Sequence, residues 1–516
     1  MAAVQDPWKL YNTSVTVRPG QTRLLRLHQN PEDGPLEADL VVVSIGPGGA
    51  YLSKTEEHVE YTALSYTWGN GPFAHHITIN GVAWRIKEGL HDFLHQYRSS
   101  TQALGGQRDR YLWVDALVIN QADASEKSHQ VASMIEVYDK ASHVQVWLGK
   151  ETKHTATAVS FLQHLLTDTQ RKNKIISTDA LDGLRDLYNR PWPTRMWIRQ
   201  EVWAAKTISI QCGSLLMPLE VFKAGMVGSR EAGDTLDGDD GSERVTGHQA
   251  SEDRAVSGLG HKAMESNGRK DILWLLYESV NYESTDVRDR IYALIGMCDD
   301  SEIEIDYHKS PSEVFTSLAR HLMLRARSLG LVLDQSCKYG RQSDLDLPSW
   351  VPDWRTLELV RYEPQYGRRC DMSGSITHDQ PHVLILYGFQ LGKAKVAKAK
   401  KKRKNEEHLN KLLVPLDWPR ISDRLKDSGL HPEFLTRAPR DQIVELDFTS
   451  GDSRPGDCLV AVCGSDNLLL LRRLPDREGA EYEFITCIHS DARRKLRESL
   501  LDYGAENNVL ETFVTV

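Results

Sequence analysis

The sequence predicts an α/β fold in which a parallel sheet carries helices on both faces, and two observations support this prediction. Between residues 61 and 212, short apolar runs of strand length alternate with segments whose apolar residues follow the helical period. Such alternation is typical of strands joined by helical crossovers, which make the strands parallel. In addition, Asn80-Gly81 lies between two short apolar runs and predicts an inserted β-hairpin, because both residues tolerate positive φ.

The elements of this region follow from their apolar residues. Strands are expected at 63–66, 77–79, 82–84, 111–114, 144–148 and 207–211. Helices are expected where one apolar face covers 90–97, 131–138, 158–165, 181–188 and 196–205. Asp123, with Glu126 three residues later, matches a capping box and predicts that a helix begins there.

The rest of the chain differs in composition from this region. Residues 1–60 read as a lead-in of irregular chain and short strands with Pro-Gly turns. Residues 213–270 read as a linker, because most of this stretch is rich in Gly and Asp and poor in apolar residues. Helical periodicity returns over 271–356, and strand-like runs over 357–516 predict a small β-rich C-terminal module.

Composition restricts the classes of partner. The 516 residues carry a net charge of −9, so we expect no nucleic-acid partner bound by bulk charge attraction. Seven cysteines without a CxxC pair indicate reduced thiols inside the cell. The N-terminus lacks a secretory apolar segment, and the sequence has no apolar run of membrane-spanning length. We therefore expect a cytoplasmic protein without a membrane partner, with the nucleus as the second candidate compartment.

Two charged or metal-binding patterns carry less weight. Lys393–Lys404 (KAKVAKAKKKRK) is typical of a nuclear-import signal or a nucleic-acid patch, and equally of a solvated loop between strands. The sequence leaves these interpretations open. His91 and His95 have the i, i+4 spacing of a metal-chelating pair. No third ligand accompanies them, so we expect exposed histidines and no metal site.

Polar, aromatic and glycine residues lie where two predicted strands give way to loops, at the edge where open α/β sheets place their ligands. These candidate substrate-binding residues are Ser65, Trp68, Gly69, Asp115, Asn120 and Gln121. Gly69 would let a ligand approach the backbone, and Trp68 would provide a stacking surface. Structural interpretations stand beside these, since Asp115 equally suits a cap for the following turn and Trp68 suits a buried position.

Glu201 is the candidate catalytic residue and lies in RMWIRQEVW, residues 195–203. A carboxylate among aromatic side chains suits stabilisation of a cationic, oxocarbenium-like centre or positioning of a water molecule. Burial would raise the pKa of Glu201, and the neighbouring arginines would lower it. The alternative is an ion pair with Arg195 or Arg199 on a solvated helix face.

Three stretches together resemble the fungal heterokaryon-incompatibility (HET) domain. They are YTALSYTWG at 61–69, LWVDALVINQADASEKSHQVASMIEVYDKASHVQVWLG at 112–149 and RPWPTRMWIRQEVW at 190–203. The resemblance agrees in order, spacing and residue types. Residues 286–297, 306–311, 347–354 and 456–473 are more loosely similar to the regions C-terminal to that domain in family members. One departure is Val118, where the family usually has a cysteine, and packing is the simpler explanation of that position.

The resemblance implies a role in fungal non-self recognition and programmed cell death. The family is also distantly similar to TIR domains, which implies a flavodoxin-like sheet. Some TIR domains cleave the nicotinamide–ribose bond of NAD⁺ with a glutamate in a W-x-x-E pattern. Trp197 and Glu201 form W-x-x-x-E, one residue longer. We therefore expect Glu201 to be catalytic, Trp197 to belong to the binding set, and NAD⁺ or a related nucleotide to be a substrate, with no cofactor.

Two classes of function remain open at this point. The first is an NAD⁺ glycohydrolase in which Glu201 stabilises the ribosyl cation. The second is a non-enzymatic signalling module that self-associates or binds a partner protein, with the same residues serving the fold.

Overall fold

The computed structural model describes most of the chain. The described residues are 10–11, 15–29, 31, 34–46, 51–52, 58–103, 111–167, 177–223, 271–298, 302–326, 329, 332, 343–356, 383–393, 395–396, 412–415, 443–446, 454–462, 468–475, 481–488 and 511–515. The chain forms two compact units, Met1–His308 and Lys309–Val516. This division falls inside 271–356, the range expected as one helical region. Each unit is described by itself.

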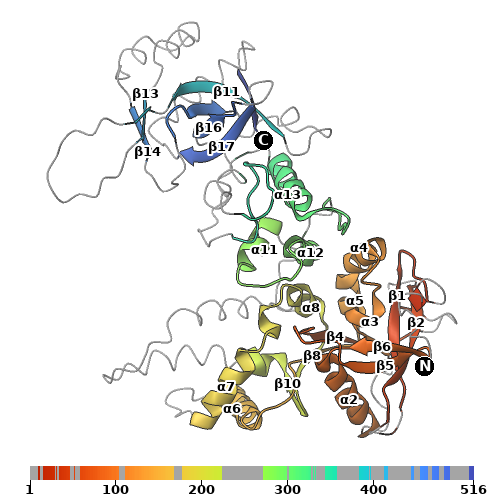
Figure 1. Ribbon diagram of the computed structural model, residues 1–516. Coiled ribbons are helices and arrows are strands. Elements are labelled where there is room, and N and C mark those ends of the chain that lie inside the picture. Colours follow the sequence, from red (N-terminus) through yellow and green to blue (C-terminus); the bar gives the residue numbers. More distant parts are fainter. Residues whose placement is uncertain are drawn as a thin grey trace. The chain divides into compact units, whose positions relative to one another are not determined.

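The first unit is built on a ten-stranded mixed sheet (Figure 1). Its strands are β1 (Gln21–Leu27), β2 (Glu37–Ile45), β3 (Tyr51–Leu52), β4 (Thr62–Tyr66), β5 (His75–Ile79), β6 (Val82–Ile86), β7 (Tyr111–Trp113), β8 (His143–Trp147), β9 (Ile208–Cys212) and β10 (Leu215–Pro218). They lie in the order β10-β9-β8-β4-β7-β1-β2-β5-β6, with β3 paired to β2.

The centre of the sheet is parallel, as the sequence predicted. Strands β7, β4, β8 and β9 are neighbours in that order, and every pairing among them is parallel. All five residues of β4 are buried, although Thr62 and Ser65 are polar. A strand is buried along its whole length when helices cover both faces of the sheet.

Antiparallel strands extend the sheet beyond what the sequence predicted. β1 pairs antiparallel with β7 and β2 with β1, so the segment read as a lead-in completes the sheet. The predicted hairpin is present as β5 and β6, with Asn80 at φ 48° and Gly81 at φ 77°. β10 pairs antiparallel with β9 and lies in the stretch read as a linker, which therefore begins with a strand. The four residues of β10 were too few to show a period in the sequence.

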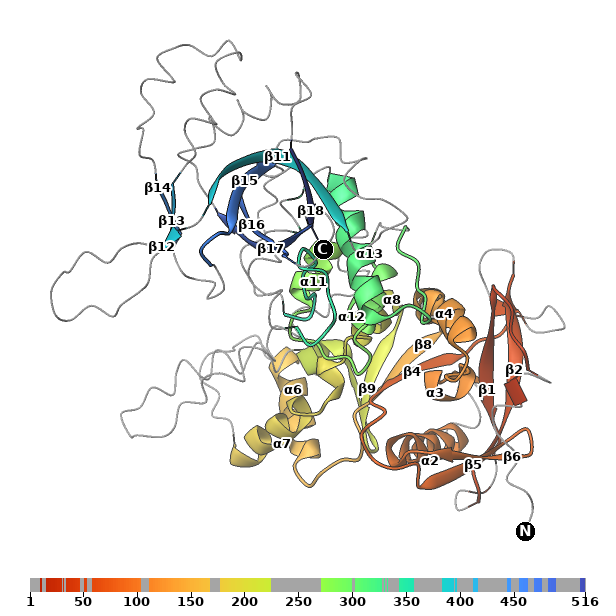
Figure 2. The same ribbon diagram turned by 45° about the horizontal axis from the view of Figure 1, so that its top comes forward.

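Helices cover both faces of this sheet. They are α2 (Glu88–Ala103), α3 (Asp115–Val118), α4 (Ala124–Ala132), α5 (Met134–Lys140), α6 (Thr155–Thr167), α7 (Thr178–Tyr188), α8 (Ile198–Ala204), α11 (Ile272–Glu278) and α12 (Asp289–Ile295). Figures 1 and 2 show α2 on one face and α4, α5 and α8 on the other. α8 contacts both α5 and α12, so the segment after the linker packs onto the sheet domain. Among the described residues, no helix is long and apolar enough to span a membrane.

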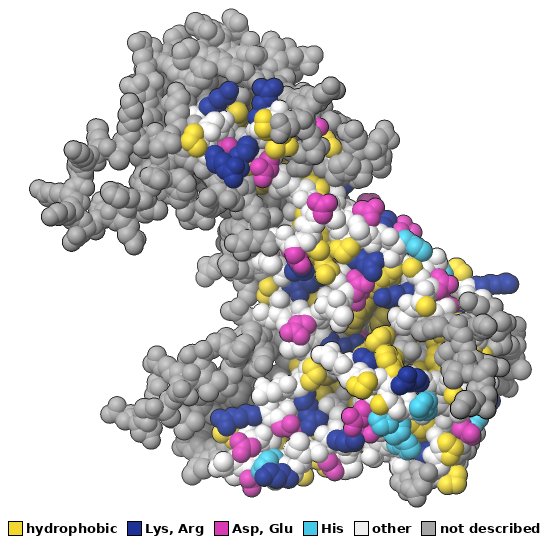
Figure 3. Space-filling view, viewed as in Figure 1, with side chains coloured by type: hydrophobic (Ala, Val, Ile, Leu, Met, Phe, Trp, Pro, Cys, Tyr) yellow, Lys and Arg dark blue, Asp and Glu magenta, His cyan; other side chains and the backbone are white. Residues whose placement is uncertain are grey.

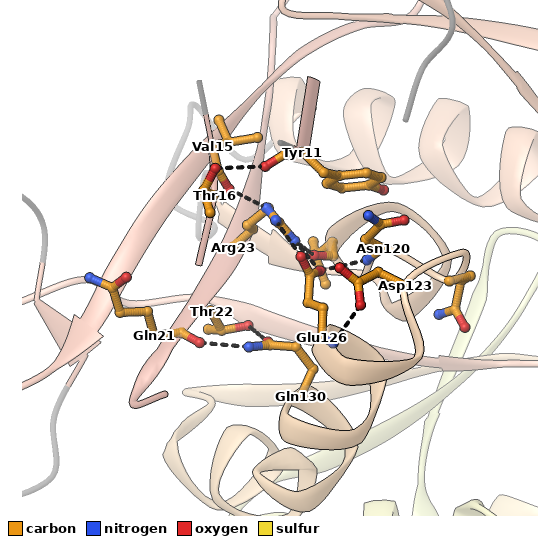
Figure 4. A network of polar contacts seen from close by, with 12 residues as sticks. Tyr11, Val15, Thr16, Gln21, Thr22, Arg23, Asn120, Asp123, Glu126 and Gln130 are labelled. Carbon is orange, nitrogen blue, oxygen red and sulfur yellow. Dashed lines mark hydrogen bonds and ion pairs between the residues drawn. The ribbon is translucent and has the colours of Figure 1, made fainter. Parts of the chain in front are cut away.

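A buried polar network joins β1 to the chain just after β7 (Figure 4). The fully buried guanidinium of Arg23 forms a two-pronged ion pair with Glu126, at 2.6 and 2.9 Å, and donates to the Val118 carbonyl at 2.8 Å. Asp123 caps α4 as predicted, accepting from the Ser125 and Glu126 amides. The carboxylate of Glu126 binds Arg23 and the Asn120 amide, a use that the capping-box pattern did not indicate.

The second unit combines a helix, a turn and a closed barrel. α13 (Pro311–Ala326) accepts a hydrogen bond at the Phe315 carbonyl from the indole of Trp354, at 3.1 Å. The barrel strands are β11 (Leu384–Lys393), β15 (Cys458–Val462), β16 (Leu468–Arg473), β17 (Glu481–Ile488) and β18 (Glu511–Thr515). A separate sheet holds β12 (Lys395–Val396), β13 (Leu412–Pro415) and β14 (Ile443–Leu446). The predicted β-rich module is thus present, whereas residues 397–404 of the basic run lie outside the described residues.

Candidate functional site

The candidate site lies at the carboxyl ends of the parallel strands. In chain order the four strands are β4, β7, β8 and β9, and β4 lies between β7 and β8. The chain therefore passes from β4 to β7 on one side of it, and then crosses back to β8 on the other side. In open α/β sheets this reversal point is where ligands bind, just outside the strand ends. Ser65, Trp68 and Asp115 lie at or directly after the ends of the two central strands, β4 and β7.

Glu201 reaches this edge from α8. Its carboxylate accepts a short hydrogen bond from the hydroxyl of Ser65. The indole of Trp192 donates to the same Ser65 oxygen at 2.7 Å. The guanidinium of Arg195 forms an ion pair with Glu201, with 3.6 Å between Nη1 and Oε1. Ser65, Trp192 and Glu201 are each at most 1% exposed, so this part of the site is closed to solvent.

Asp115 forms the outer, partly exposed side of the site. Its carboxylate accepts from the indole of Trp68, at 3.1 and 3.0 Å, and from the Ala116 amide at 2.7 Å. Asp115 is the first residue of α3 rather than its N-cap, which is Val114, and its carboxylate accepts from an amide of the first turn. Its role in binding stays a prediction. Gly69 adopts φ 70° with nothing within 4 Å of an added Cβ, and its carbonyl accepts from Lys87 at 2.6 Å.

Two carboxylates share one guanidinium in this site. Burial raises the pKa of Glu201 above its ordinary value, while Arg195 and the Ser65 hydroxyl lower it and Asp115 raises it again. Burial likewise raises the pKa of Asp115, against the lowering effect of Arg195. The pKa of Arg195 is raised because the attraction of both acids outweighs its burial. The site therefore holds one positive charge that attracts two acids, and burial favours the protonated form of each acid.

Comparison with known proteins adds the family. Residues 61–201 match the family model described as heterokaryon incompatibility protein (HET). This part of the chain is therefore similar to the HET domain. Over 429 residues the chain is 26% identical to "Heterokaryon incompatibility protein 6, OR allele" of Neurospora crassa, covering 66% of this chain and 61% of that relative. The chain thus spans about 61% of the length of the curated relative that it matches. No solved structure matches the chain.

Asn120 and Gln121 do not join the acids at the strand edge. Asn120 is 2% exposed, and its side-chain oxygen accepts from the Ala122 amide at 3.2 Å. Gln121 donates from Nε2 to the backbone carbonyl of Asp115 at 3.2 Å. Both amides therefore shape the turn after α3. A binding role for either residue stays a prediction.

Trp197, also expected in the binding set, points toward another acid. Its indole donates to Asp289 of α12 at 2.9 Å, and the hydroxyl of Tyr307 donates to the second oxygen of Asp289 at 2.6 Å. Trp197 is the residue that precedes α8, so this contact lies one helical turn from Glu201. It joins the matched range to a segment that lies outside that range.

Sequence reasoning did not assign Arg195, Trp192 or Tyr66 to the site. Arg195 was considered only as a surface partner of Glu201, yet its side chain is 17% exposed and one of its nitrogens is buried without a hydrogen-bond partner. Tyr66 is buried, and its pKa is raised well above the ordinary value by burial and then by Asp115. A signal was available in part, since Tyr66 directly follows Ser65 at the strand end.

Two histidines of α2, His91 and His95, form ring contacts with each other and with His75 of β5. The rings of His75 and His91 stack with their centroids 4.2 Å apart, and those of His91 and His95 are 4.5 Å apart. Figure 3 shows a group of histidine side chains on the surface of the first unit, among interspersed acidic and basic residues. Within the described part of the chain, no three His, Cys, Asp or Glu side chains are arranged to hold a metal ion.

Proposed function

We propose that this chain acts in fungal non-self recognition and programmed cell death, and that its HET domain cleaves the nicotinamide–ribose bond of NAD⁺. The match over residues 61–201 and the similarity to a heterokaryon incompatibility protein support the first part. The order of the parallel strands supports a relation to TIR domains. Across the sheet, the neighbours β7, β4, β8 and β9 are the second, first, third and fourth of these strands along the chain. The first four strands of a flavodoxin-like sheet have the same order.

The observation that carries the enzymatic proposal is the convergence of Ser65, Asp115, Arg195 and Glu201 at the reversal point of the sheet. Cleavage breaks the bond between C1′ of the ribose and the nicotinamide nitrogen, and the bonding electron pair leaves with nicotinamide. The Glu201 carboxylate would stabilise the cationic ribosyl centre. Water then bonds to C1′ and releases a proton, giving ADP-ribose.

A second function is favoured by the burial of Glu201. This side chain is 1% exposed and already satisfied by Ser65 and Arg195, so a substrate could reach it only after residues near Arg195 move. The same contacts would serve a non-enzymatic module that acts in the cytoplasm by self-association or by binding a partner protein. On the enzymatic proposal, assembly would instead open the site.

The experiment compares NAD⁺ loss by the purified wild type, Glu201→Gln and Glu136→Gln, with the chain both free and held in oligomers. Gln has the shape of Glu and can still accept from Ser65, but it carries no charge for a cationic centre. Glu136 is a residue of α5 that is not buried and serves as the matched control. We expect turnover by wild type and by Glu136→Gln, and a loss of at least about 100-fold in Glu201→Gln.

The two functions give different results in cells. If NAD⁺ stays constant in every oligomeric form of the wild type, the enzymatic proposal is wrong. Growth arrest that persists in Glu201→Gln and requires an assembly surface would then support the signalling module. Growth arrest that is lost together with NAD⁺ turnover would support the enzyme.

A further inference from the structure

Asp289 is a buried acid outside the matched range that bonds directly to the segment carrying the site. It is 8% exposed and has a hydrogen-bond donor on each oxygen. One donor is the indole of Trp197, immediately before α8, and the other is the hydroxyl of Tyr307. Among the described hydrogen bonds and ion pairs, none joins Asp289 to Glu201, Ser65 or Arg195. Asp289 would therefore act on the site through Trp197.

Backbone contacts from the same part of the chain hold the residues just before Trp197. The Met196 amide donates to the Glu283 carbonyl at 2.7 Å, and the Glu283 amide donates to the Thr194 carbonyl at 2.5 Å. These two bonds flank Arg195, the partner of Glu201. The segment that includes Glu283 and Asp289 therefore holds residues 194–197 by both backbone and side chain.

The position of Trp197 is transmitted to Glu201 through a short helix. The Glu201 amide donates to the Trp197 carbonyl at 3.3 Å, so these residues share the first turn of α8. A helical turn is stiff, because its residues move together once the backbone bonds form. A change in the hold on Trp197 therefore shifts Glu201 relative to Ser65 on β4.

The charge of Asp289 depends on groups from three segments. The pKa of Asp289 is raised to about 6, mainly by burial and to a smaller extent by the charge of Asp286. The hydrogen bonds from Tyr307 and Trp197 and the charge of Lys127 of α4 act in the opposite direction and lower this pKa. Asp286 is itself paired with Arg288 at 2.7 Å, and Lys127 lies 3.9 Å from the centre of the Tyr307 ring. No described group forms an ion pair with Asp289, so burial is the dominant influence and its pKa of about 6 lies near neutral pH.

We propose that Asp289 is a positioning residue of the HET-domain site, which holds Trp197 and thereby α8, and which loosens that hold when it takes up a proton. A hydrogen bond to a carboxylate is stronger than one to a neutral acid, so protonation weakens the bond from the indole. The proposal rests on the proposed function in one respect, because it takes the contact between Glu201 and Ser65 as the one that matters.

Tryptophan indoles provide a direct test that does not depend on NAD⁺ turnover. The full chain, with its 12 tryptophans labelled with nitrogen-15, would be followed by NMR, and the Trp197 and Trp192 signals would be assigned by their loss in Trp197→Phe and Trp192→Phe. Trp192 reports on the site, since it bonds to the oxygen of Ser65 that donates to Glu201. In wild type we expect both signals to shift with a common midpoint near the Asp289 pKa of about 6.

Three variants identify the group that titrates. Asp289→Asn keeps both hydrogen bonds, because its oxygen can accept from Trp197 and its NH₂ can donate to Tyr307, but it has no charge to lose. Both signals should then be flat over that pH range. Tyr307→Phe removes a donor to the carboxylate and should raise the common midpoint. Asp286→Asn removes an equal charge from the same segment without touching Trp197, so both signals should still titrate.

Two outcomes overturn the proposal. A Trp197 signal that titrates while Trp192 stays flat would make Asp289 a local anchor only. A Trp192 titration that survives Asp289→Asn would belong to Glu201 or another acid. If the signals behave as expected while NAD⁺ is never consumed, the positioning role holds and the enzymatic function fails.

Discussion

At the scale of single residues, Arg195 decides the charge state of the site. It is the shared partner of two acids, and its own side chain is 17% exposed. Removing one member of a buried ion pair leaves a charge without compensation, which typically costs about 3–5 kcal/mol. Glu201 can reduce this cost by taking up a proton, since burial already raises its pKa. The site therefore tolerates the loss of Arg195 better in acid than at neutral pH.

We predict that Arg195→Met lowers the free energy of unfolding by about 3 kcal/mol at pH 7 and by less near pH 5. Without Arg195, the pKa of Glu201 in the folded state would rise further above its unfolded value. This rise sets the direction of the pH dependence. A native state that binds more protons than the unfolded state loses stability as pH rises through that interval. Urea unfolding at both pH values measures this difference.

The matched control is Arg185→Met on α7. Arg185 is also paired with an acid, Asp182 at 3.4 Å, but its side chain is 58% exposed. An exposed pair contributes little, so we expect a change below about 0.5 kcal/mol at either pH. Equal losses in the two variants would show that Arg195 is not compensating a buried charge.

Asp289 gives a second prediction of pH dependence. Here the stability of the wild type itself should fall as pH rises. Its pKa is about 6 in the fold against 3.8 outside it, so wild-type stability falls as pH rises between those values. The difference corresponds to about 3 kcal/mol at pH 7. Asp289→Asn has no charge to bury, so its stability relative to wild type should increase by up to that amount from pH 4 to pH 7. Thermal melting of both proteins across this range would show parallel curves if the prediction is wrong.

Sequence reasoning located part of this site for a physical reason. Ser65, Trp68 and Asp115 lie at or just after strand ends, and parallel strands bring their carboxyl ends to one edge, so their proximity could be expected. The structure brings them together with Glu201, whereas their role in binding stays a prediction. Asp289 could not be found this way, because 92 residues separate it from Trp197 and no local pattern records such a contact.

At the scale of elements, the packing of α12 against α5 and α8 explains why the segment after the linker belongs to the sheet domain. Gly296, directly after α12, has no room for a side chain. An added Cβ would lie 2.9 Å from Cδ1 and 3.0 Å from Cβ of Ile135, and 3.1 Å from Oε1 of Gln200. The three helices thus meet at a position that only glycine fits without movement.

We predict that Gly296→Ala lowers the free energy of unfolding by about 1–3 kcal/mol, because overpacking forces neighbouring side chains or backbone to shift. Gly71→Ala is the control, since nothing lies within 4 Å of its added Cβ. That variant should unfold at the wild-type denaturant concentration or slightly above it, because alanine restricts the unfolded chain. If both variants unfold alike, α12 does not pack as closely as the structure indicates.

Elements were predictable where a local signal existed. The β5–β6 hairpin followed from Asn80-Gly81, and the start of α4 from the Asp123 cap. The partners of each strand were not predictable, since pairing depends on contacts across the whole domain. β1 and β2 were read as strands of a lead-in, yet β1 completes the sheet beside β7. The closing of the C-terminal strands into a barrel is a tertiary event of the same kind.

At the scale of the whole molecule, the folded unit is larger than the matched HET segment. Residues before 61 supply β1, and with it Arg23, which is 0% exposed and bonds to Glu126. Thr22 accepts from the indole of Trp113 at 3.2 Å and donates to Gln130 at 2.8 Å. Residues after 270 supply Asp289 and the backbone contacts of Glu283. Flanking segments on both sides therefore complete the core around the site.

A fragment of residues 61–212 should consequently fail to fold, whereas residues 1–308 should fold cooperatively. The shorter piece leaves the edge of β7 unpaired and leaves Glu126 without Arg23. It also leaves the indoles of Trp113 and Trp197 without their acceptors. Loss of the ion pair alone costs about 3–5 kcal/mol, a large share of the roughly 5–15 kcal/mol that stabilises a typical domain. Circular dichroism during urea titration should show one sharp transition for 1–308 and none for 61–212. A fragment of residues 61–308 restores Asp289 but lacks β1, so it separates the two contributions. A sharp transition in this fragment would mean that the segment after the linker completes the core by itself. The pairing of β1 with β7 would then be dispensable.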